Sequence, residues 1–336
     1  MTLIVIQKGF ASSVQDLGRY GYQRYGMIVG GAMDQPSAKL ANWLTGNHES
    51  AAMIEFSFLG PSILFTEDCL FALTGAVCRP TLDGNSIGTG RPCLARAGQI
   101  LVIGGMVHGS RGYLSVAGGV DTPLWFGSRS TYGKAGCGGF EGRLLEEHDR
   151  IPVGKPSEEA RRVMAVLAEA KLQTVRWSAL PRRKYQETQT IRVIPDTLWP
   201  RFSTASREAF LKTEYQITPS SDRMGFRLNG AELTLDNPLE LYSEAVTNGS
   251  IQVPRNGQPI ILMTDHQSTG GYPRIAQVAS ADLPLLAQLP PGSTLRFQMI
   301  SSEQGEAALV RQEEELEQLH RCIRVGIVKQ ITGFSD

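Results

Sequence analysis

The chain has 336 residues, and its 33 basic side chains balance its 33 acidic ones. A net charge of zero gives no electrostatic reason to expect binding to nucleic acid or to an anionic membrane surface. Thirty-six glycines and 18 prolines separate many short apolar runs, a composition that favours a strand-rich and turn-rich fold over a helical bundle.

The N-terminal segment MTLIVIQKGF has too few consecutive apolar residues for a signal peptide, and no later run is long enough to cross a membrane. The five cysteines are odd in number and include no CxxC pair. Such cysteines are typical of reduced thiols and give no sign of a zinc site. Together these features predict a cytoplasmic protein without a metal site.

The length suggests two domains, at about 150 residues each. Leu3–Ile6 reads as a first strand, and short apolar runs continue to about residue 120. The pattern changes near residue 150, where a helical periodicity begins. We therefore predict an N-terminal β-rich lobe over 1–150, a connecting helix and linker over 151–188, and a C-terminal β-rich lobe over 189–336 that ends in a helix. Within the last lobe, alternation predicts a strand at Leu233–Leu235, and the charged C-terminal helix is expected from Ser302 to about His320.

The loop after the first strand mixes repeated glycines with charged side chains, among them Asp16, Arg19 and Arg24. It has two readings of equal weight: a polar surface for a ligand or partner, or a loop shaped by glycines and held by an Arg–Asp pair. Asp34 precedes the pattern of a short helix, so we expect it to be the N-cap of that helix and not a catalytic residue.

Two glycine-containing segments resemble nucleotide-binding motifs but match neither of them. Gly127–Lys134 has five residues between its glycines and no hydroxyl after the lysine, so it is not a P-loop. Gly136–Gly139 does not match the dinucleotide fingerprint. Cys137, which lies among these glycines, has no base beside it in the sequence and is interpreted as a packed thiol.

The stretch 242–278 is the richest in chemistry. It places carboxylates, amides, a histidine and an arginine around three turns that contain proline or glycine. Between the turns, Ile251–Val253 and Ile260–Met263 read as short buried strands. Polar groups at strand ends beside glycines are a common way to build a pocket, but an ordinary hairpin has the same pattern. Local pattern leaves both readings open.

Several longer motifs carry a resemblance to a known family: SVQDLGRYGYQRYGM, YLSVAGGVD, SDRMGFRLNG and IQVPRNGQPIILMTDHQSTGGYPRIAQV. With them the chain resembles, over about residues 3–335, the family called allophanate hydrolase subunit 2-like. This family includes the C subunit of the bacterial 5-oxoprolinase and the KipA-type antagonist of a sporulation kinase inhibitor. The resemblance implies a mainly β fold with few helices, built as two cyclophilin-like β-barrel lobes.

The resemblance also implies partners and an activity. They are a B subunit (subunit 1-like) and an A subunit, which together with this chain would carry out the ATP-dependent ring opening of 5-oxo-L-proline to L-glutamate. The chain alone would be inactive. Two alternatives come with the family: an antagonist that binds a B-subunit-like inhibitor of a sporulation kinase, and a carboxyltransferase half that passes a carboxyl group from carboxybiotin to a urea-like amide.

Each of these substrates presents an amide that must be held by both its carbonyl and its N–H group. On these chemical grounds we assign catalytic roles to Asp265 and Gln267. Substrate-binding roles are assigned to motif positions in the same stretch and in the N-terminal loop: Gln252, Thr269, Gly270, Gly271, Tyr272, Arg274, Asp16, Arg19 and Arg24. His266 departs from the arginine or alanine expected within the motif, so no role is assigned to it.

Overall fold

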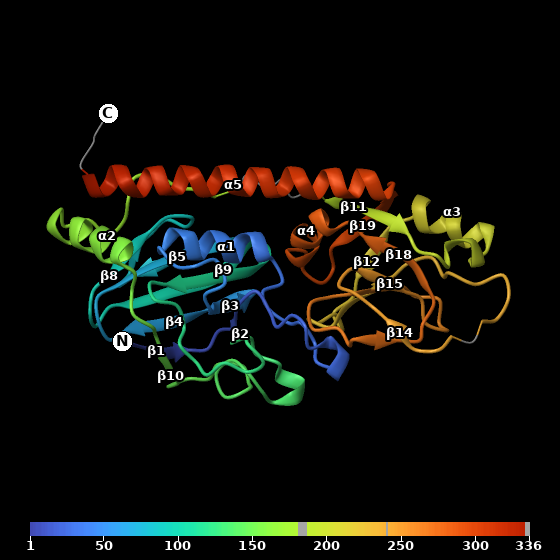
Figure 1. Cartoon of the computed structure of the whole chain (residues 1–336), viewed down its shortest axis with the longest axis horizontal. Helices are drawn as coiled ribbons and strands as arrows, with labels where there is room; N and C mark the ends of the chain where they lie inside the picture. The colour runs from blue at the N-terminus through green and yellow to red at the C-terminus, as the bar shows by residue number, and fades with distance from the viewer. Residues whose placement is uncertain (181–186, 240, 333–336) are drawn as a thin grey trace. The chain divides into compact units, whose positions relative to one another are not determined.

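The computed structural model describes residues 1–180, 187–239 and 241–332 (Figure 1). Contacts within the chain divide it into two compact units. Unit 1 comprises Met1–Arg19, Asp34–Arg183 and Glu315–Asp336, and unit 2 comprises Tyr20–Met33 and Lys184–Glu314. Neither unit is continuous in sequence, because an early loop belongs to unit 2 and the last segment of the chain belongs to unit 1.

Unit 1 is built on a ten-stranded sheet whose main path runs β10-β1-β4-β9-β3-β2. Its strands are β1 Thr2–Gln7, β2 Ala11–Gln15, β3 Met53–Ser57, β4 Leu59–Phe65, β5 Cys69–Cys78, β6 Thr81–Leu82, β7 Asn85–Ser86, β8 Cys93–Ala95, β9 Ile100–Val116 and β10 Arg150–Pro152. The 17-residue β9 pairs with β3, β4, β5 and β6. Gly112 of β9 is required by packing, because a Cβ there would lie 2.4 Å from the ring of Phe56.

Three helical segments accompany this sheet in unit 1: α1 Gln35–Leu44, α2 Glu158–Glu169 and the C-terminal part of α5. They share an apolar cluster that includes Leu44, Leu167 and Ile327. The predicted N-cap is confirmed, since the Asp34 side chain accepts a hydrogen bond from Ser37 N at the start of α1. The helix predicted after residue 150 is also confirmed, and Ser157 caps it.

Unit 2 contains a closed barrel in the order β11-β18-β15-β16-β13-β12-β19. Its strands are β11 Thr188–Pro195, β12 Tyr215–Ile217, β13 Gly225–Asn229, β15 Ser250–Gln252, β16 Ile260–Leu262, β18 Arg274–Val278 and β19 Thr294–Met299. The barrel closes because β11 pairs with β18 on one side and, in parallel, with β19 on the other. The same unit holds α3 Thr204–Lys212, α4 Leu283–Ala287 and a small antiparallel ribbon of β14 Glu244–Ala245 and β17 Thr269–Gly270.

The predicted mainly β fold with few helices and two β-rich lobes is confirmed. The lobe in unit 2 is a closed seven-stranded barrel, and the lobe in unit 1 is a curled, half-barrel sheet. Two details differ from the sequence patterns. The C-terminal helix, α5 Ser302–Thr332, runs well past His320, because Ile323 and Ile327 continue its buried face. The alternating Leu233–Leu235 makes only an isolated bridge, from Leu235 to Phe202. None of the described helices is long and apolar enough to cross a bilayer.

Candidate functional site

The stretch 242–278 folds as one wall of the unit 2 barrel with a ribbon beside it. The two predicted buried strands are confirmed as β15 and β16, which pair through Ile251 and Ile261. On its other side β15 pairs with β18, where Gln252 lies opposite Arg274 across a register shift. The ribbon β14–β17 brings Gly270 back opposite Glu244. The predicted site residues of this stretch therefore come from β15, β18, the ribbon strand β17 and the two loops that flank β17, which hold Asp265, Gln267, Gly271 and Tyr272.

Gln252 is the most unusual side chain of this wall. It is only 1% exposed, and among the described residues its Nε2 atom has no hydrogen-bond partner. A buried amide donor left in this state costs about 1–3 kcal/mol. A buried donor that the folded chain does not satisfy marks a place where another acceptor, such as a ligand or a water molecule, would be stabilised.

Gly270 lies directly against this donor. A Cβ atom at residue 270 would come within 2.5 Å of Gln252 Nε2 and 3.4 Å of Gln267 Nε2. The amide nitrogens of Gln252 and Gln267 therefore both lie close to the position that a side chain at residue 270 would occupy. Amide N–H groups donate to carbonyl oxygens, so this arrangement suits the oxygen of an amide or a related acceptor. At Gly271 a Cβ would meet nothing nearer than 3.6 Å.

Arg274 has its side chain committed within the protein. Its Nε donates to Asp196 Oδ2 at 3.0 Å, and its Nη2 donates to Glu244 Oε2 at 2.9 Å. Burial by itself would lower the pKa of Arg274, but hydrogen bonds to Asp196 and Glu244 raise it above its ordinary value. The pair with Glu244 fastens the ribbon to β18. No sequence pattern singled out Asp196, which directly follows β11, although its position at a strand end was a usable signal.

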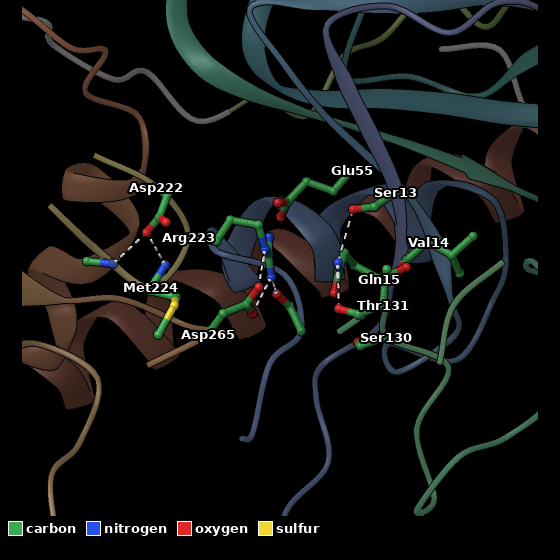
Figure 2. Close-up of polar contacts among 12 residues, drawn as sticks. Ser13, Val14, Gln15, Glu55, Ser130, Thr131, Asp222, Arg223, Met224 and Asp265 are labelled. Carbon is green, nitrogen blue, oxygen red and sulfur yellow. Dashed lines mark hydrogen bonds and ion pairs between the residues drawn. The ribbon is translucent and has the colours of Figure 1, made fainter. Parts of the chain in front are cut away.

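Asp265 is held by Arg223 in a bidentate ion pair (Figure 2). Arg223 Nε donates to Oδ2 at 2.9 Å and Nη2 donates to Oδ1 at 3.0 Å, while the same Nη2 donates to the carbonyl of Gly31 at 2.6 Å. Both side chains are largely buried, with exposed fractions of 22% for Arg223 and 12% for Asp265. This geometry fixes the segment after β16 and holds the Asp265 carboxylate in one orientation.

The neighbours of Asp265 differ in exposure. His266 is buried, its Nδ1 lies 2.6 Å from the carbonyl oxygen of Gln267, and burial lowers its pKa. The hydroxyl of Thr264 is buried without a partner among the described residues. Thr269 and Tyr272 are exposed, and Tyr272 keeps 49% of its surface open. The wall thus combines a buried amide donor with an open aromatic edge.

The predicted residues of the N-terminal loop have other surroundings. In unit 1 the Asp16 carboxylate accepts hydrogen bonds from four donors: Gly18 N, Ser128 Oγ, Arg129 N and Ser130 Oγ. Arg19 is 1% exposed, donates to the Ser130 carbonyl and lies 5.1 Å from the Trp125 ring. Arg24, in unit 2, lies over the ring of Tyr25 at 4.7 Å. Asp16 and Arg19 therefore organise the loop over residues 121–143.

Two further groups lie in or beside this loop. Gln15 donates to Ser13 Oγ at 3.0 Å (Figure 2), and its Oε1 is buried without a partner among the described residues. No sequence pattern pointed to Gln15. Cys137 is no activated nucleophile, because burial raises the pKa of its thiol and the Arg19 charge only partly offsets that shift.

Known proteins resemble this chain over most of its length. Residues 25–299 match the family described as carboxyltransferase domain, subdomain A and B. The chain is 40% identical, over 317 residues, to the C subunit of 5-oxoprolinase from Escherichia coli, an alignment that covers 94% of this chain and 97% of that protein. The protein of the same name from Haemophilus influenzae is 38% identical over 93% of this chain and 96% of its own length.

Solved structures agree with the sequence relatives. The urea amidolyase of K. lactis superimposes with a TM-score of 0.84 and 27% identity, over 95% of this chain and 20% of that one. The urea carboxylase of Kluyveromyces lactis gives a TM-score of 0.85 at 27% identity, over 95% of this chain and 29% of that one. This chain thus spans only a fifth to a third of those longer proteins. It belongs to the carboxyltransferase domain family, subdomains A and B.

Proposed function

We propose that this chain is the C subunit of a 5-oxoprolinase, a hydrolase that opens the ring of 5-oxo-L-proline to give L-glutamate. The observation that carries the proposal is the 40% identity to the Escherichia coli protein of that name, which extends over 94% of one chain and 97% of the other. Because the match covers both chains almost completely, no large segment of either lacks a counterpart.

The chemistry of a lactam fits the wall around Gln252. An amide resists attack because its C–N bond is resonance-stabilised, and donors at the carbonyl oxygen help by stabilising the negative charge that develops there when the carbon is attacked. Gln252 Nε2, buried and without a partner among the described residues, and Gln267 Nε2 both border the space at Gly270. In our proposal they donate to the lactam oxygen. Asp265 and Arg274 hold the segment and the ribbon in place through their ion pairs with Arg223, Asp196 and Glu244.

In this proposal the chain works with an A and a B subunit, is inactive without them, and does not itself hold the ATP of the reaction. The segment nearest to a phosphate cradle, Gly127–Lys134, does not fit one. Its Ser128 and Ser130 are fully buried and donate their hydroxyls to Asp16, so neither is available to a phosphate or to its metal ion. We place the complex in the cytoplasm, where its five free cysteines would stay reduced.

A second candidate is the transfer of a carboxyl group from carboxybiotin to a urea-like amide. It is favoured by the fold match to the urea amidolyase of K. lactis, at a TM-score of 0.84. Urea presents a carbonyl oxygen to the same two donors that a lactam would use, so the wall alone does not separate the two reactions. The products separate the two reactions. Hydrolysis releases glutamate, whereas carboxyl transfer places a carboxyl group derived from labelled bicarbonate on the urea-like amide.

The test is reconstitution from purified subunits. The full chain is mixed with A and B subunits, 5-oxoproline and ATP, and free glutamate is measured over time. We expect glutamate only when all three proteins and ATP are present. Equal release by A and B without this chain would overturn the proposal. The second candidate is tested in a parallel mixture with a carboxybiotin carrier protein and urea, where transfer of labelled carboxyl to urea that depends on this chain would support it.

A further inference from the structure

A cleft in unit 1, far along the sequence from the Gln252 wall, has no part in the function proposed above. It has a volume of about 230 Å³ and lies where the end of α1 and the start of α2 meet one face of α5. Figure 1 shows these three helical segments next to one another. The cleft is lined by Trp43, Gly46, Asn47, Glu159, His320, Arg324 and Ile327.

The walls of the cleft are firmly built. The Trp43 and His320 rings stack with their centroids 4.3 Å apart and their planes 8° from parallel. Asn47 Nδ2 donates to the Val116 carbonyl at 2.7 Å, and Asn47 Oδ1 accepts from Gly118 N at 2.8 Å. Because the aromatic and amide walls are fixed by these contacts, little side-chain order would have to be created when a ligand binds.

Gly46 lets the end of α1 approach the start of α2. It adopts a φ of +68°, and a Cβ there would lie 3.0 Å from Ser157 Oγ. Ser157 is the N-cap of α2, and Glu159 follows in its first turn. His320, Arg324 and Ile327 recur every three or four residues and so share one face of α5. The close approach at Gly46 therefore places the Glu159 carboxylate and the Arg324 guanidinium on the border of one cleft.

The charges on this border are opposite but not joined. Among the described residues neither Glu159 nor Arg324 forms an ion pair or a hydrogen bond through its charged group, although Glu159 and Arg324 both act on His320. Burial and the Arg324 charge lower the pKa of His320, while Glu49 and Glu159 oppose that shift. Glu49 itself has Lys39 at 4.0 Å. The lining therefore offers one cationic group, Arg324, and one anionic group, Glu159, around the Trp43–His320 stack.

We propose that this cleft binds a free α-amino acid in its zwitterionic form. Arg324 would meet the carboxylate and Glu159 the ammonium group, with the Trp43–His320 stack as the floor. The volume lies below the ~300 Å³ at which pockets for drug-sized ligands begin, so the occupant is expected to be smaller than a drug-sized molecule. Two opposite charges on the protein match a zwitterion better than a simple anion, which would leave Glu159 facing like charge.

The test is isothermal titration calorimetry on the full chain with free glycine, L-glutamate, N-acetylglycine and methylamine. The two amino acids are expected to bind with dissociation constants of about 1 mM or tighter. N-acetylglycine lacks the ammonium group and methylamine lacks the carboxylate, so each is expected to bind at least ~tenfold more weakly. Binding is also expected to change the fluorescence of Trp43, and the Trp43→Phe variant should lose that change.

Paired variants supply the control. Arg324→Gln and Glu159→Gln should each weaken amino-acid binding at least ~tenfold. Arg321→Gln and Glu158→Gln are the controls, because they remove neighbouring surface charges on the same two helices. Arg321 pairs with Glu317, and Glu158 pairs with Arg161 and Arg162. Both control variants should leave binding unchanged. The proposal is overturned if neither amino acid binds, if N-acetylglycine binds as tightly as free glycine, or if both pairs of variants behave alike. None of these results depends on the proposed 5-oxoprolinase activity.

Discussion

Gly270 covers the amide of Gln252 so closely that a Cβ atom at residue 270 would come within 2.5 Å of Gln252 Nε2. The backbone at Gly270 does not have the positive φ that would exclude a side chain. A methyl group added at residue 270 would therefore press against the Gln252 amide without straining the local backbone.

The first prediction follows from this contact. Gly270→Ala should lower kcat/KM of the reconstituted complex for 5-oxoproline at least ~tenfold, because the methyl group occupies the space that the lactam oxygen needs. Gly105→Ala is the matched control, since its Cβ would meet nothing within 4 Å and the residue has no assigned role. Steady-state kinetics and thermal unfolding of both variants make the comparison. Equal activities for the two would show that the space at residue 270 is not used by substrate.

The second prediction concerns the Arg223–Asp265 ion pair. Asp265→Asn should lower the free energy of unfolding by about 1–3 kcal/mol, because it leaves a largely buried guanidinium without its charged partner. Denaturant titration of Asp265→Asn, Arg223→Ala and the double variant should give a coupling energy of at least ~1 kcal/mol. The exposed Asp236 provides the control, as Asp236→Asn.

The opposite result would support the catalytic role that the sequence predicts for Asp265. It would consist of unchanged stability in Asp265→Asn together with loss of glutamate release by the complex. A positioning residue changes stability and activity together, whereas a base removed from an intact site changes activity alone.

Local signals predicted much of this fold correctly. The strands at Ile251–Val253 and Ile260–Met263, the N-cap at Asp34 and the helix after Ser157 all depend on residues close in sequence, and all are confirmed. Alternation at Leu233–Leu235 predicted a strand that does not form. Leu233 is buried, but among the described residues it pairs with no strand. Alternation predicts which side chains are buried and does not show whether a partner strand is present.

Long-range pairing was beyond the sequence patterns. Nothing local to Arg274 indicates that Asp196, 78 residues earlier, accepts its hydrogen bond. Nor does the pattern of Tyr20–Met33 show that this loop belongs to unit 2, where Met33 joins the barrel core and Gly30 N donates to the Thr264 carbonyl at 3.3 Å. The role of Gln252 as an unsatisfied donor likewise appears only when its burial is known.

The third prediction uses the lowered pKa of His266, which burial causes. The unfolded chain takes up a proton near pH 6.5, while the folded chain resists protonation until lower pH. The stability due to neutral His266 is therefore present above about pH 6.5 and is lost as the pH falls below it, with a slope of at most ~1.4 kcal/mol per pH unit.

This pH dependence can be measured by denaturant unfolding between pH 7 and pH 5. His266→Gln should reduce the loss of stability across that window, because the group that resists protonation is gone. His48→Gln, at an exposed histidine, should leave the slope as it is in the unaltered chain. A slope that His266→Gln does not change would mean that protonation of this buried ring does not contribute to unfolding.

The central claim is that Gln252 Nε2 serves a ligand and not the fold. Its most direct test is Gln252→Met, which keeps the length of the side chain and removes the donor. Removing a buried donor that has no partner among the described residues should leave stability unchanged or raise it. We expect kcat/KM of the reconstituted complex for 5-oxoproline to fall at least ~tenfold while the unfolding midpoint stays or rises. Full activity in this variant would contradict the claim.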